Sequence, residues 1–323
     1  MSATEPRARY RGVLPQLRDT PFLADGGIET TLIFQDGHDL PHFAAYDLLT
    51  HDGGGEALRR YFEPYARLAA GRSVGIVLET ATWRANPDWA DRLGHSPEQL
   101  ADLNRRAVEI LEDVRAAYET QDAPIVISGC IGPRGDGYVV GDAMTAEEAE
   151  TYHATQIGTF AETAADLVTA LTMTYSAEAV GIVRAARAAG MPVVISFTVE
   201  TDGRLPSGQP LRAAIEEVDA ATDGYAAYFM VNCAHPSHFD TVLEPGSAWT
   251  DRVMGLRANA SRLSHAELDE AEELDPGNPE ELALEYLALR ERLPRLTVLG
   301  GCCGTDDRHV EAMYAAWCGE TVA

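Results

Sequence analysis

The sequence is poor in basic side chains, and this shortage excludes two classes of partner. Its 323 residues include 25 Lys+Arg against 51 Asp+Glu, a formal net charge of −26. Lys and Arg form no cluster along the chain, so an anionic nucleic acid or membrane surface would be repelled. We therefore expect neither as a partner, and we interpret the acidic excess as a solvated surface that keeps the protein soluble.

Long apolar runs are also missing. No segment offers about 18 uncharged apolar residues in succession, and residues 1–12 contain no apolar stretch of signal-peptide length. These absences predict a cytoplasmic protein. Apolar residues still make up 46% of the chain, enough for a substantial core. No Gly/Ser linker or low-complexity tract divides the sequence, so we expect residues 1–323 to form a single domain.

Cysteine is scarce and odd in number. Five cysteines do not make the paired framework of a small secreted domain, and the adjacent Cys302 and Cys303 are poorly placed to bond to each other. In a reducing compartment, such thiols suggest metal binding or catalysis. We expect Cys130 and Cys318 to be structural, with Cys130 lining a pocket without binding metal.

Eight short, β-branched apolar segments alternate with longer segments of helical periodicity. The expected strands are 22–26, 75–79, 125–130, 167–173, 193–198, 227–233, 253–257 and 297–301. Continuously apolar strands are typical of a parallel sheet covered by helices. Eight strand–helix units in about 300 residues predict a (β/α)8 TIM barrel. A doubly wound sheet is the alternative, but residues 25–29 lack the glycine pattern of its phosphate loop.

Several helix boundaries can be read directly. Residues 96–99 and 145–148 have the pattern of capping boxes that open two long helices. A third helix is expected over 177–189, ended by a glycine. Pro236 is expected to begin the helix after the sixth strand. The acidic stretch 267–281 is expected to be an extended excursion on the surface.

Three cysteines follow expected strand ends. Cys233 closes the sixth strand, and Cys302 and Cys303 close the eighth. Catalytic groups of a (β/α)8 barrel lie at the carboxyl ends of the strands, so all three thiols can face one mouth. Three thiolates can hold Zn²⁺ with tetrahedral geometry and leave a fourth position open, as in catalytic zinc sites.

The residues around these cysteines support the same interpretation. Gly300, Gly301 and Gly304 would let the backbone bend so that two consecutive thiols reach one ion. His235 and His238 are alternative ligands, but they are expected more often beside the site or on the surface.

The combined motifs resemble one family. The ending Gly300–Thr305, together with Asn232-Cys233 and Asp25-Gly26-Gly27, closely resembles the homocysteine S-methyltransferase family. Further matching pieces are Thr30, Leu32, 80–82, 129–133 and 195–198. The resemblance spans almost the whole chain, and the double cysteine with its distant partner is its most specific part.

The resemblance implies a zinc enzyme. Cys233, Cys302 and Cys303 would bind Zn²⁺, and the thiol of homocysteine would take the open position. Coordination lowers the pKa of a thiol, so a thiolate is available at neutral pH to attack the methyl carbon of a sulfonium or ammonium donor, giving methionine. No general base is needed, so no catalytic residue is expected beyond the zinc site. The implied partners are a small thiol and a methyl donor, and a homo-oligomer is compatible with the sequence.

The resemblance also implies a substrate-binding set at the same face. It comprises Asp25, Gly26, Gly27, Glu29, Glu79, Thr80, Thr82 and Asn232. Asp25 matches a position that helps to hold the amino group of homocysteine. The family commonly has a glutamate at the end of the fourth strand, where this chain has Leu171 or Thr172. Unless Glu29 or Glu79 substitutes for it, Asp25 would then have to carry most of the contact with the ammonium group of homocysteine.

The missing glutamate leaves other functions open. The chain could be a zinc-dependent S-alkyltransferase for a different small thiol or donor, or a zinc or redox sensor without turnover. Arg84 could bind an acidic substrate or a carboxylate of the protein's own surface. About 20 residues follow Cys303, which is too few for a cobalamin or folate module after the barrel. We therefore expect a free small-molecule donor such as S-methylmethionine or S-adenosylmethionine.

Overall fold

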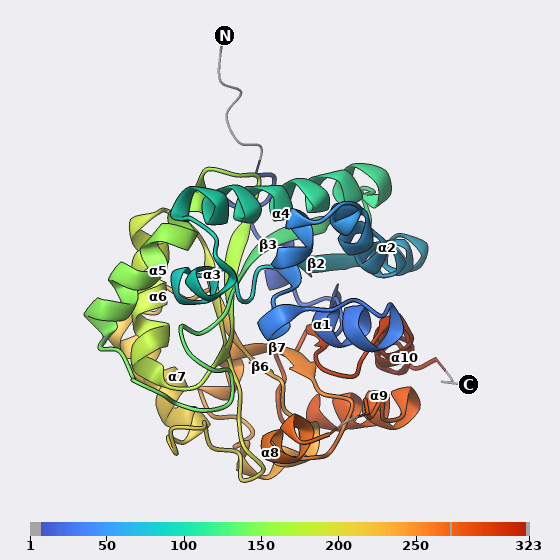
Figure 1. The fold of residues 1–323 in the computed structure, drawn as a ribbon. Coiled ribbons are helices and arrows are strands. Elements are labelled where there is room, and N and C mark those ends of the chain that lie inside the picture. Colours follow the sequence, from blue (N-terminus) through green and yellow to red (C-terminus); the bar gives the residue numbers. More distant parts are fainter. Residues whose placement is uncertain (1–7, 272, 321–323) are drawn as a thin grey trace.

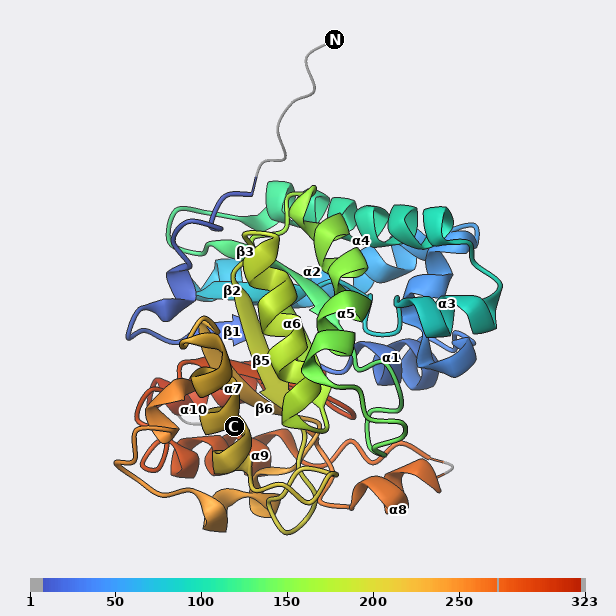
Figure 2. The same ribbon diagram turned by 90° about the vertical axis from the view of Figure 1, so that its left-hand side faces the viewer.

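Eight parallel strands close into a barrel, as the sequence predicted. The structure is a computed structural model that describes residues 8–271 and 273–320. Each strand pairs with the next in the chain, and β8 closes the barrel against β1 with Phe22 opposite Val298. Helices surround the strands in Figure 1, and Figure 2 shows the barrel from its side. The strands are β1 Phe22–Ala24, β2 Gly75–Glu79, β3 Ile125–Ile131, β4 Leu167–Met173, β5 Val193–Phe197, β6 Tyr228–Asn232, β7 Val253–Ala258 and β8 Val298–Gly301.

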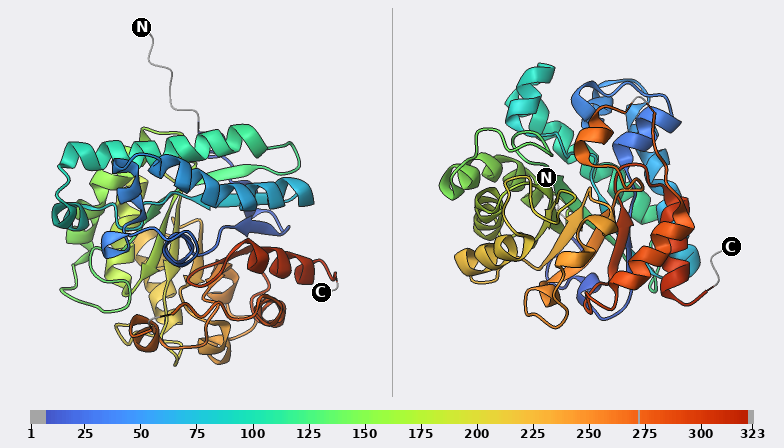
Figure 3. Two further views of the ribbon diagram at one scale, coloured as in Figure 1. Left: turned by 45° about the vertical axis from the view of Figure 1, so that its right-hand side comes forward. Right: turned by 90° about the horizontal axis from the view of Figure 1, so that it is seen from below.

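Helices cover the outside of the barrel. They are α1 Ile28–Thr30, α2 Gly54–Arg72, α3 Pro87–Leu93, α4 Pro97–Tyr118, α5 Ala146–Ala161, α6 Ser176–Ala188, α7 Leu211–Thr222, α8 His265–Asp269, α9 Pro279–Leu289 and α10 Asp307–Trp317. The two predicted capping boxes are confirmed at Ser96 and Thr145. Helices α9 and α10 pack together near the carboxyl end of the chain (Figure 3). None of the described helices is both long and apolar enough to cross a membrane.

Of two predictions about the second half of the chain, one was wrong and the other was confirmed only in part. Pro236 begins only a three-residue 3-10 helix, Pro236–His238. Two further 3-10 helices, Asp240–Val242 and Thr250–Arg252, complete the connection to β7. A proline that fixes the first helical φ cannot extend a helix whose following residues lack helical periodicity. The acidic stretch 267–281 is exposed at most of its described residues, as expected, but the end of α8 and the start of α9 lie within it.

Every strand is buried over its whole length, which explains its apolar composition. A buried charged pair lies at the amino end of the barrel, where Arg115 of α4 forms an ion pair with Asp166, just before β4. Asp166 also accepts hydrogen bonds from the backbone N–H groups of Tyr10, at 2.8 Å, and Ile127, at 2.9 Å. This carboxylate therefore ties the N-terminal segment, α4 and β3 together away from the mouth.

Replacing Arg115 by Met should destabilise the barrel strongly. The change leaves the fully buried Asp166 carboxylate without its counter-ion, which typically costs about 3–5 kcal/mol of unfolding free energy. Urea denaturation would measure the loss. The matched control is Arg105→Met, which removes an exposed pair with Glu162 and should cost less than about 1 kcal/mol. Similar losses in both variants would contradict the role assigned to Asp166.

Candidate metal and substrate site

The three predicted cysteines meet at the carboxyl ends of the strands. The Sγ atoms of Cys233, Cys302 and Cys303 all lie within 4.8 Å of one another, and they form the one such metal-ligating group among residues 8–271 and 273–320. The structure joins Cys233 to Cys302 as a disulfide and leaves Cys303 as a free thiol. Free thiols were expected at all three positions, and zinc ligation requires both partners of this pair in the reduced state.

The end of β7 holds the cysteines in this arrangement. The backbone N–H of Cys233 donates to the carbonyl of Arg257 at 3.1 Å, and that of Cys302 donates to the carbonyl of Ala258 at 2.8 Å. The N–H of Ala260 in turn donates to the carbonyl of Cys303 at 3.0 Å. A strand that lies between β6 and β8 thus sets the spacing of thiols that are 69 residues apart in the chain.

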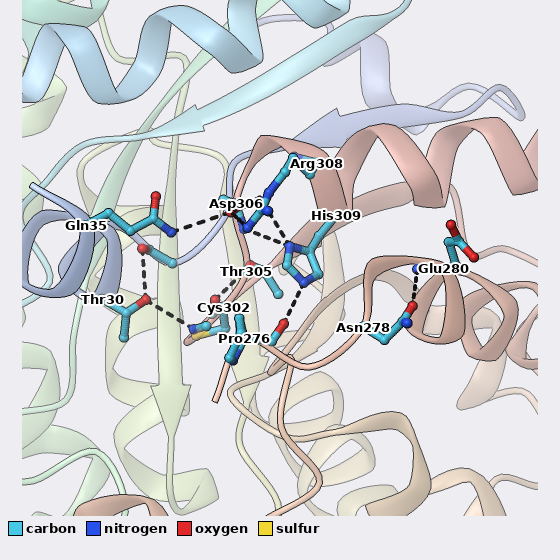
Figure 4. Close-up of polar contacts among 12 residues, drawn as sticks. Thr30, Gln35, Pro276, Asn278, Glu280, Cys302, Thr305, Asp306, Arg308 and His309 are labelled. Carbon is cyan, nitrogen blue, oxygen red and sulfur yellow. Dashed lines mark hydrogen bonds and ion pairs between the residues drawn. The ribbon is translucent and has the colours of Figure 1, made fainter. Parts of the chain in front are cut away.

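The Cys302–Cys303 turn is fixed from two further sides (Figure 4). Thr30, which follows β1, accepts the N–H of Gly304 at 3.1 Å and donates to the carbonyl of Gly27 at 3.1 Å. His309 on α10 lies 2.9 Å from the carbonyl of Pro276 and receives the N–H of Asp306 on its other ring nitrogen. These contacts join the first and last strand ends around the double cysteine.

The glycines of the motif work differently from one another. Gly304 has a φ of +81°, which is the left-handed conformation that the turn requires. Gly301 is needed for close packing instead, because a Cβ there would collide with the Thr305 side chain. Gly27 approaches the backbone of Cys302 in the same way. Gly26 and Gly27 both line the cavity. Both are also packed so closely against neighbouring residues that a Cβ would collide with them.

Neither alternative histidine belongs to the cysteine group. His235 lies 2.8 Å from Ser237 Oγ and 3.1 Å from Glu285, and burial lowers its pKa to about 4. His238 lies 2.9 Å from the carbonyl of Arg262. Both rings are buried rather than on the surface.

A cavity of about 460 Å³ opens next to the thiols. Its size is that of a small-molecule site. Seven of the eight predicted substrate-binding residues line it, namely Asp25, Gly26, Gly27, Glu29, Glu79, Thr80 and Asn232. Thr82 does not: it is fully buried, lies 2.6 Å from Thr80 Oγ1 and donates to the carbonyl of Cys130. Cys130 lines the cavity outside the cysteine group, as expected.

Asp25 is already engaged by the protein. One of its carboxylate oxygens accepts from Arg257 Nη1 at 2.9 Å and from the N–H of Glu79 at 3.4 Å, and the other accepts from Tyr61 Oη at 3.1 Å. Burial disfavours the Arg257 cation, but the attraction of Asp25 outweighs it and raises the pKa of the guanidinium. Sequence reasoning missed Arg257 and Tyr61. A charged residue at the end of an otherwise apolar strand was the available signal for Arg257.

Two other carboxyl groups of the cavity, those of Glu79 and Glu29, have raised pKa values. Burial raises the pKa of Glu79 to about 7 against the opposing effect of Arg257, and one of its oxygens has no hydrogen-bond partner. Burial also raises the pKa of the half-buried Glu29 to about 7. Both groups therefore change charge near neutral pH, and Glu79 keeps a free acceptor beside the cavity.

The end of β4 carries no carboxylate and forms a bulge at Thr172 instead. A register shift between Ala170 and Met173 puts Thr172 in the left-handed region, with a φ of +63°. Asn232 fixes this bulge, since its amide oxygen accepts the N–H of Thr172 at 2.8 Å and its amide nitrogen donates to Thr172 Oγ1 at 2.8 Å. Thr172 Oγ1 lies 3.9 Å from Cys233 Sγ.

The acidic stretch after β7 covers the mouth. Leu268, Asp269, Ala271, Glu273, Leu274 and Asp275 line the cavity. His265, at the start of α8, stacks on Tyr138 with ring centroids 4.0 Å apart and donates to the carbonyl of Cys233 at 2.7 Å. Tyr138 Oη lies 3.8 Å from Cys303 Sγ. No motif marked Tyr138, His265 or this cover in the sequence.

Once the Cys233–Cys302 pair is reduced, the three thiols are close enough to reach one tetrahedral metal ion. Zn–S bonds of about 2.3 Å require sulfur atoms about 3.8 Å apart, and all three Sγ atoms already lie within 4.8 Å of one another. Burial raises the pKa of the Cys303 thiol to about 11, and the Glu29 carboxylate adds to the effect. A thiolate here therefore needs a cation beside it.

Serine in place of Cys302 or Cys303 should abolish zinc binding. About one zinc per chain is expected for the unmodified protein, purified under reducing conditions and measured by elemental analysis. Cys318→Ala is the control, because this thiol is exposed just beyond α10. Full zinc content in a Cys302→Ser, Cys303→Ser protein would remove the proposed ligand set.

Comparison with known proteins agrees with these observations. The family model of homocysteine S-methyltransferase matches residues 22–317. The chain is 23% identical to a selenocysteine Se-methyltransferase of Brassica oleracea var. italica, over 90% of this chain and 87% of that protein. It is 21% identical to homocysteine S-methyltransferase 2 of Arabidopsis thaliana, over 74% and 77% of the two chains.

A solved structure has the same fold. The oxidized form of the homocysteine methyltransferase MmuM from Escherichia coli superposes with a TM-score of 0.72 at 20% identity, covering 94% of this chain and 98% of that one. Its metallated form gives a TM-score of 0.70. From the family match over nearly the whole barrel, we conclude that the chain belongs to the homocysteine S-methyltransferase family and is an S-methyltransferase.

Proposed function

We propose that this protein transfers a methyl group from a sulfonium or ammonium donor to the thiol of homocysteine, giving methionine, with Zn²⁺ held by Cys233, Cys302 and Cys303. The observation that carries the proposal is the grouping of three thiols within 4.8 Å at the mouth of the barrel. Zinc bound there would lower the pKa of a substrate thiol and keep it as the nucleophilic thiolate at neutral pH.

The chain's own residues would bind and orient the acceptor. The ammonium group of homocysteine needs a carboxylate, and Glu79 offers an acceptor oxygen without a partner. Asp25 contributes negative charge, but both its oxygens already accept hydrogen bonds from Arg257, Tyr61 and the backbone. We therefore assign the ammonium contact mainly to Glu79, in place of the glutamate that β4 lacks.

The cover formed by α8 and the following residues would exclude water from the reacting atoms. Leu268 and Leu274 supply apolar surface to the cavity, while Tyr138 and His265 stack beside the thiols. Water is neither a reactant nor a product of the methyl transfer, so its exclusion costs the reaction nothing. A closed apolar site also strengthens the electrostatic interactions of charged groups inside it.

A different acceptor is the second candidate. The two residues at the β4 bulge, Leu171 and Thr172, present no charge to the cavity. One relative is named for methylation of selenocysteine, so a selenol or another small thiol could occupy the same position.

Mass spectrometry of reaction mixtures tests the proposed function. Zinc-loaded protein is incubated with homocysteine and either S-methylmethionine or S-adenosylmethionine, and methionine should form with one of these donors. Cys303→Ser should reduce the rate to background, whereas Cys318→Ala should not. If a methylated product forms from another thiol or a selenol and none forms from homocysteine, the assignment of homocysteine as acceptor is wrong, but zinc-dependent methyl transfer still holds.

The preference for an ammonium group should depend on pH through Glu79. Because burial raises the pKa of this carboxyl to about 7, the carboxylate form that attracts ammonium is lost as the pH falls below that value and is fully present above it. The measurement is the dissociation constant of homocysteine relative to 4-mercaptobutanoate, which lacks the amino group, across this range. The ratio should favour homocysteine more strongly at higher pH.

The Glu79→Gln variant is the matched control for this titration. It should lose most of the preference, about 10-fold or more, and the remaining preference should vary little with pH. A pH dependence that survives the substitution would assign the ammonium contact to Glu29 instead.

A further inference from the structure

A buried guanidinium stands in the cavity wall without an adequate partner. Arg84 follows β2, is 7% exposed and lines the same cavity as the three cysteines. Its guanidinium carbon lies 4.0 Å from the ring centroid of Trp83 and 4.0 Å from that of Trp89. The two indoles hold the charged group in one place, which is the arrangement that favours arginine over lysine.

The donor groups of Arg84 are mostly unused. Among the described residues, its only hydrogen bond runs from Nη1 to the carbonyl of Gly135, at 2.8 Å. Nε is buried without a partner. Asp136, which is 52% exposed at the rim, approaches Nη2 only to 3.8 Å, beyond hydrogen-bond distance. The buried Arg257 differs, because it donates to both Asp25 and the carbonyl of Gly26.

Burial of a cation in this way is costly unless an anion joins it. Burial lowers the pKa of Arg84 to about 10, although Asp136 and Glu29 oppose this effect, so the group remains charged at neutral pH. A planar guanidinium with free N–H groups matches a carboxylate, which can accept two parallel hydrogen bonds.

We propose that Arg84 is a carboxylate-binding residue of this cavity and selects a substrate that carries an acid group. The proposal rests on the proposed function only in taking the cavity as the substrate site. It assigns the acid to an amino-acid-like ligand, either the acceptor thiol or the methyl donor.

Trp83 connects Arg84 with the part of the cavity wall next to the thiols. Thr172 lies 3.9 Å from Cys233 Sγ, and a Cβ built on Gly137 would touch both Thr172 and the Trp83 ring. Trp83 Nε1 also donates to the carbonyl of Leu171 at 3.4 Å. Trp83 is therefore in contact with Arg84 on one side and lies next to the β4 bulge, which borders Cys233, so the guanidinium and the thiols belong to one continuous wall.

The same geometry disfavours a donor without an acid. An aromatic pair commonly attracts cationic ligands, but Arg84 already occupies a face of each indole. A ligand bearing only positive charge would be repelled by this guanidinium. A zwitterionic ligand would present its carboxylate to Arg84 and its ammonium to Glu79.

Calorimetric titration of the zinc-loaded protein with single ligands tests the proposal, since no methyl transfer is needed. The acceptor pair is homocysteine and 3-aminopropane-1-thiol, which lacks the carboxylate. The donor pair is S-methylmethionine and 3-(dimethylsulfonio)propylamine. The unmodified protein should prefer the acid in at least one pair, and Arg84→Gln should reduce that preference about 10- to 100-fold.

Which pair responds identifies the source of the carboxylate. Loss confined to the thiol pair assigns Arg84 to the acceptor, and loss confined to the sulfonium pair assigns it to the donor. Arg84→Lys should recover part of the preference, because it restores the charge without the planar fork. Arg105→Gln, on the exposed face of α4, should change nothing.

Equal affinities within both pairs, or a preference that survives in Arg84→Gln, would overturn the proposal. Arg84 would then be a brace between the loops after β2 and β3. Because affinity ratios are taken within one variant, a general loosening of the cavity cancels out. The affinity ratios do not depend on turnover, so they remain valid even if no methyl transfer is observed. The proposed function and the role of Arg84 can therefore be rejected independently.

Discussion

The backbone hydrogen bonds at the end of β7 are the constraint on which the site depends. Carbonyl groups of Arg257 and Ala258 receive the N–H groups of Cys233 and Cys302, one from each neighbouring strand connection. Thiols separated by 69 residues are thereby brought together without any local sequence motif that spans them. Parallel pairing of β6, β7 and β8 fixes the direction of all three strand ends, so the cysteines meet at one face of the barrel.

Charge in the cavity is arranged around the same strand. Arg257, near the end of β7, forms an ion pair with Asp25 after β1, and Glu79 at the end of β2 keeps an oxygen without a hydrogen-bond partner. A second guanidinium, Arg84, lines the same cavity with its charge largely unmatched. The cavity wall therefore carries both a carboxyl oxygen without a partner, on Glu79, and an incompletely paired guanidinium, although the whole chain has a net charge of −26.

The barrel could be predicted because its signal repeats eight times. Each strand is a short apolar run between helical segments, and an error at one boundary leaves the count unchanged. All eight expected strands are present, with ends shifted by one or two residues, as in β1, which stops at Ala24. The cysteine grouping was predictable for a related reason, since residues that follow parallel strands must face the same side.

The cover over the mouth could not be predicted in this way. Its sequence, 267–281, is acidic, and acidic composition normally indicates a solvated surface. The apolar residues with which it lines the cavity are Leu268, Ala271 and Leu274, and three such residues in a largely irregular segment give a weak periodic signal. Likewise, Tyr138 and Tyr61 reach the site from loops and helices whose positions depend on tertiary packing.

The β4 bulge leaves this strand end without a carboxylate. With Leu171 and Thr172 at the strand end, the Thr172 backbone takes a left-handed φ that a β-branched residue normally avoids. Asn232 makes this conformation tenable by hydrogen bonding to both the N–H and the hydroxyl of Thr172. A carboxylate is thus absent from β4, and the negative charge next to the thiols comes from the ends of β1 and β2 instead. Arg257 in β7 pairs with Asp25 and opposes the rise in the pKa of Glu79. In the proposed function, binding of the substrate's ammonium group therefore depends on the same strand, β7, that positions the cysteines.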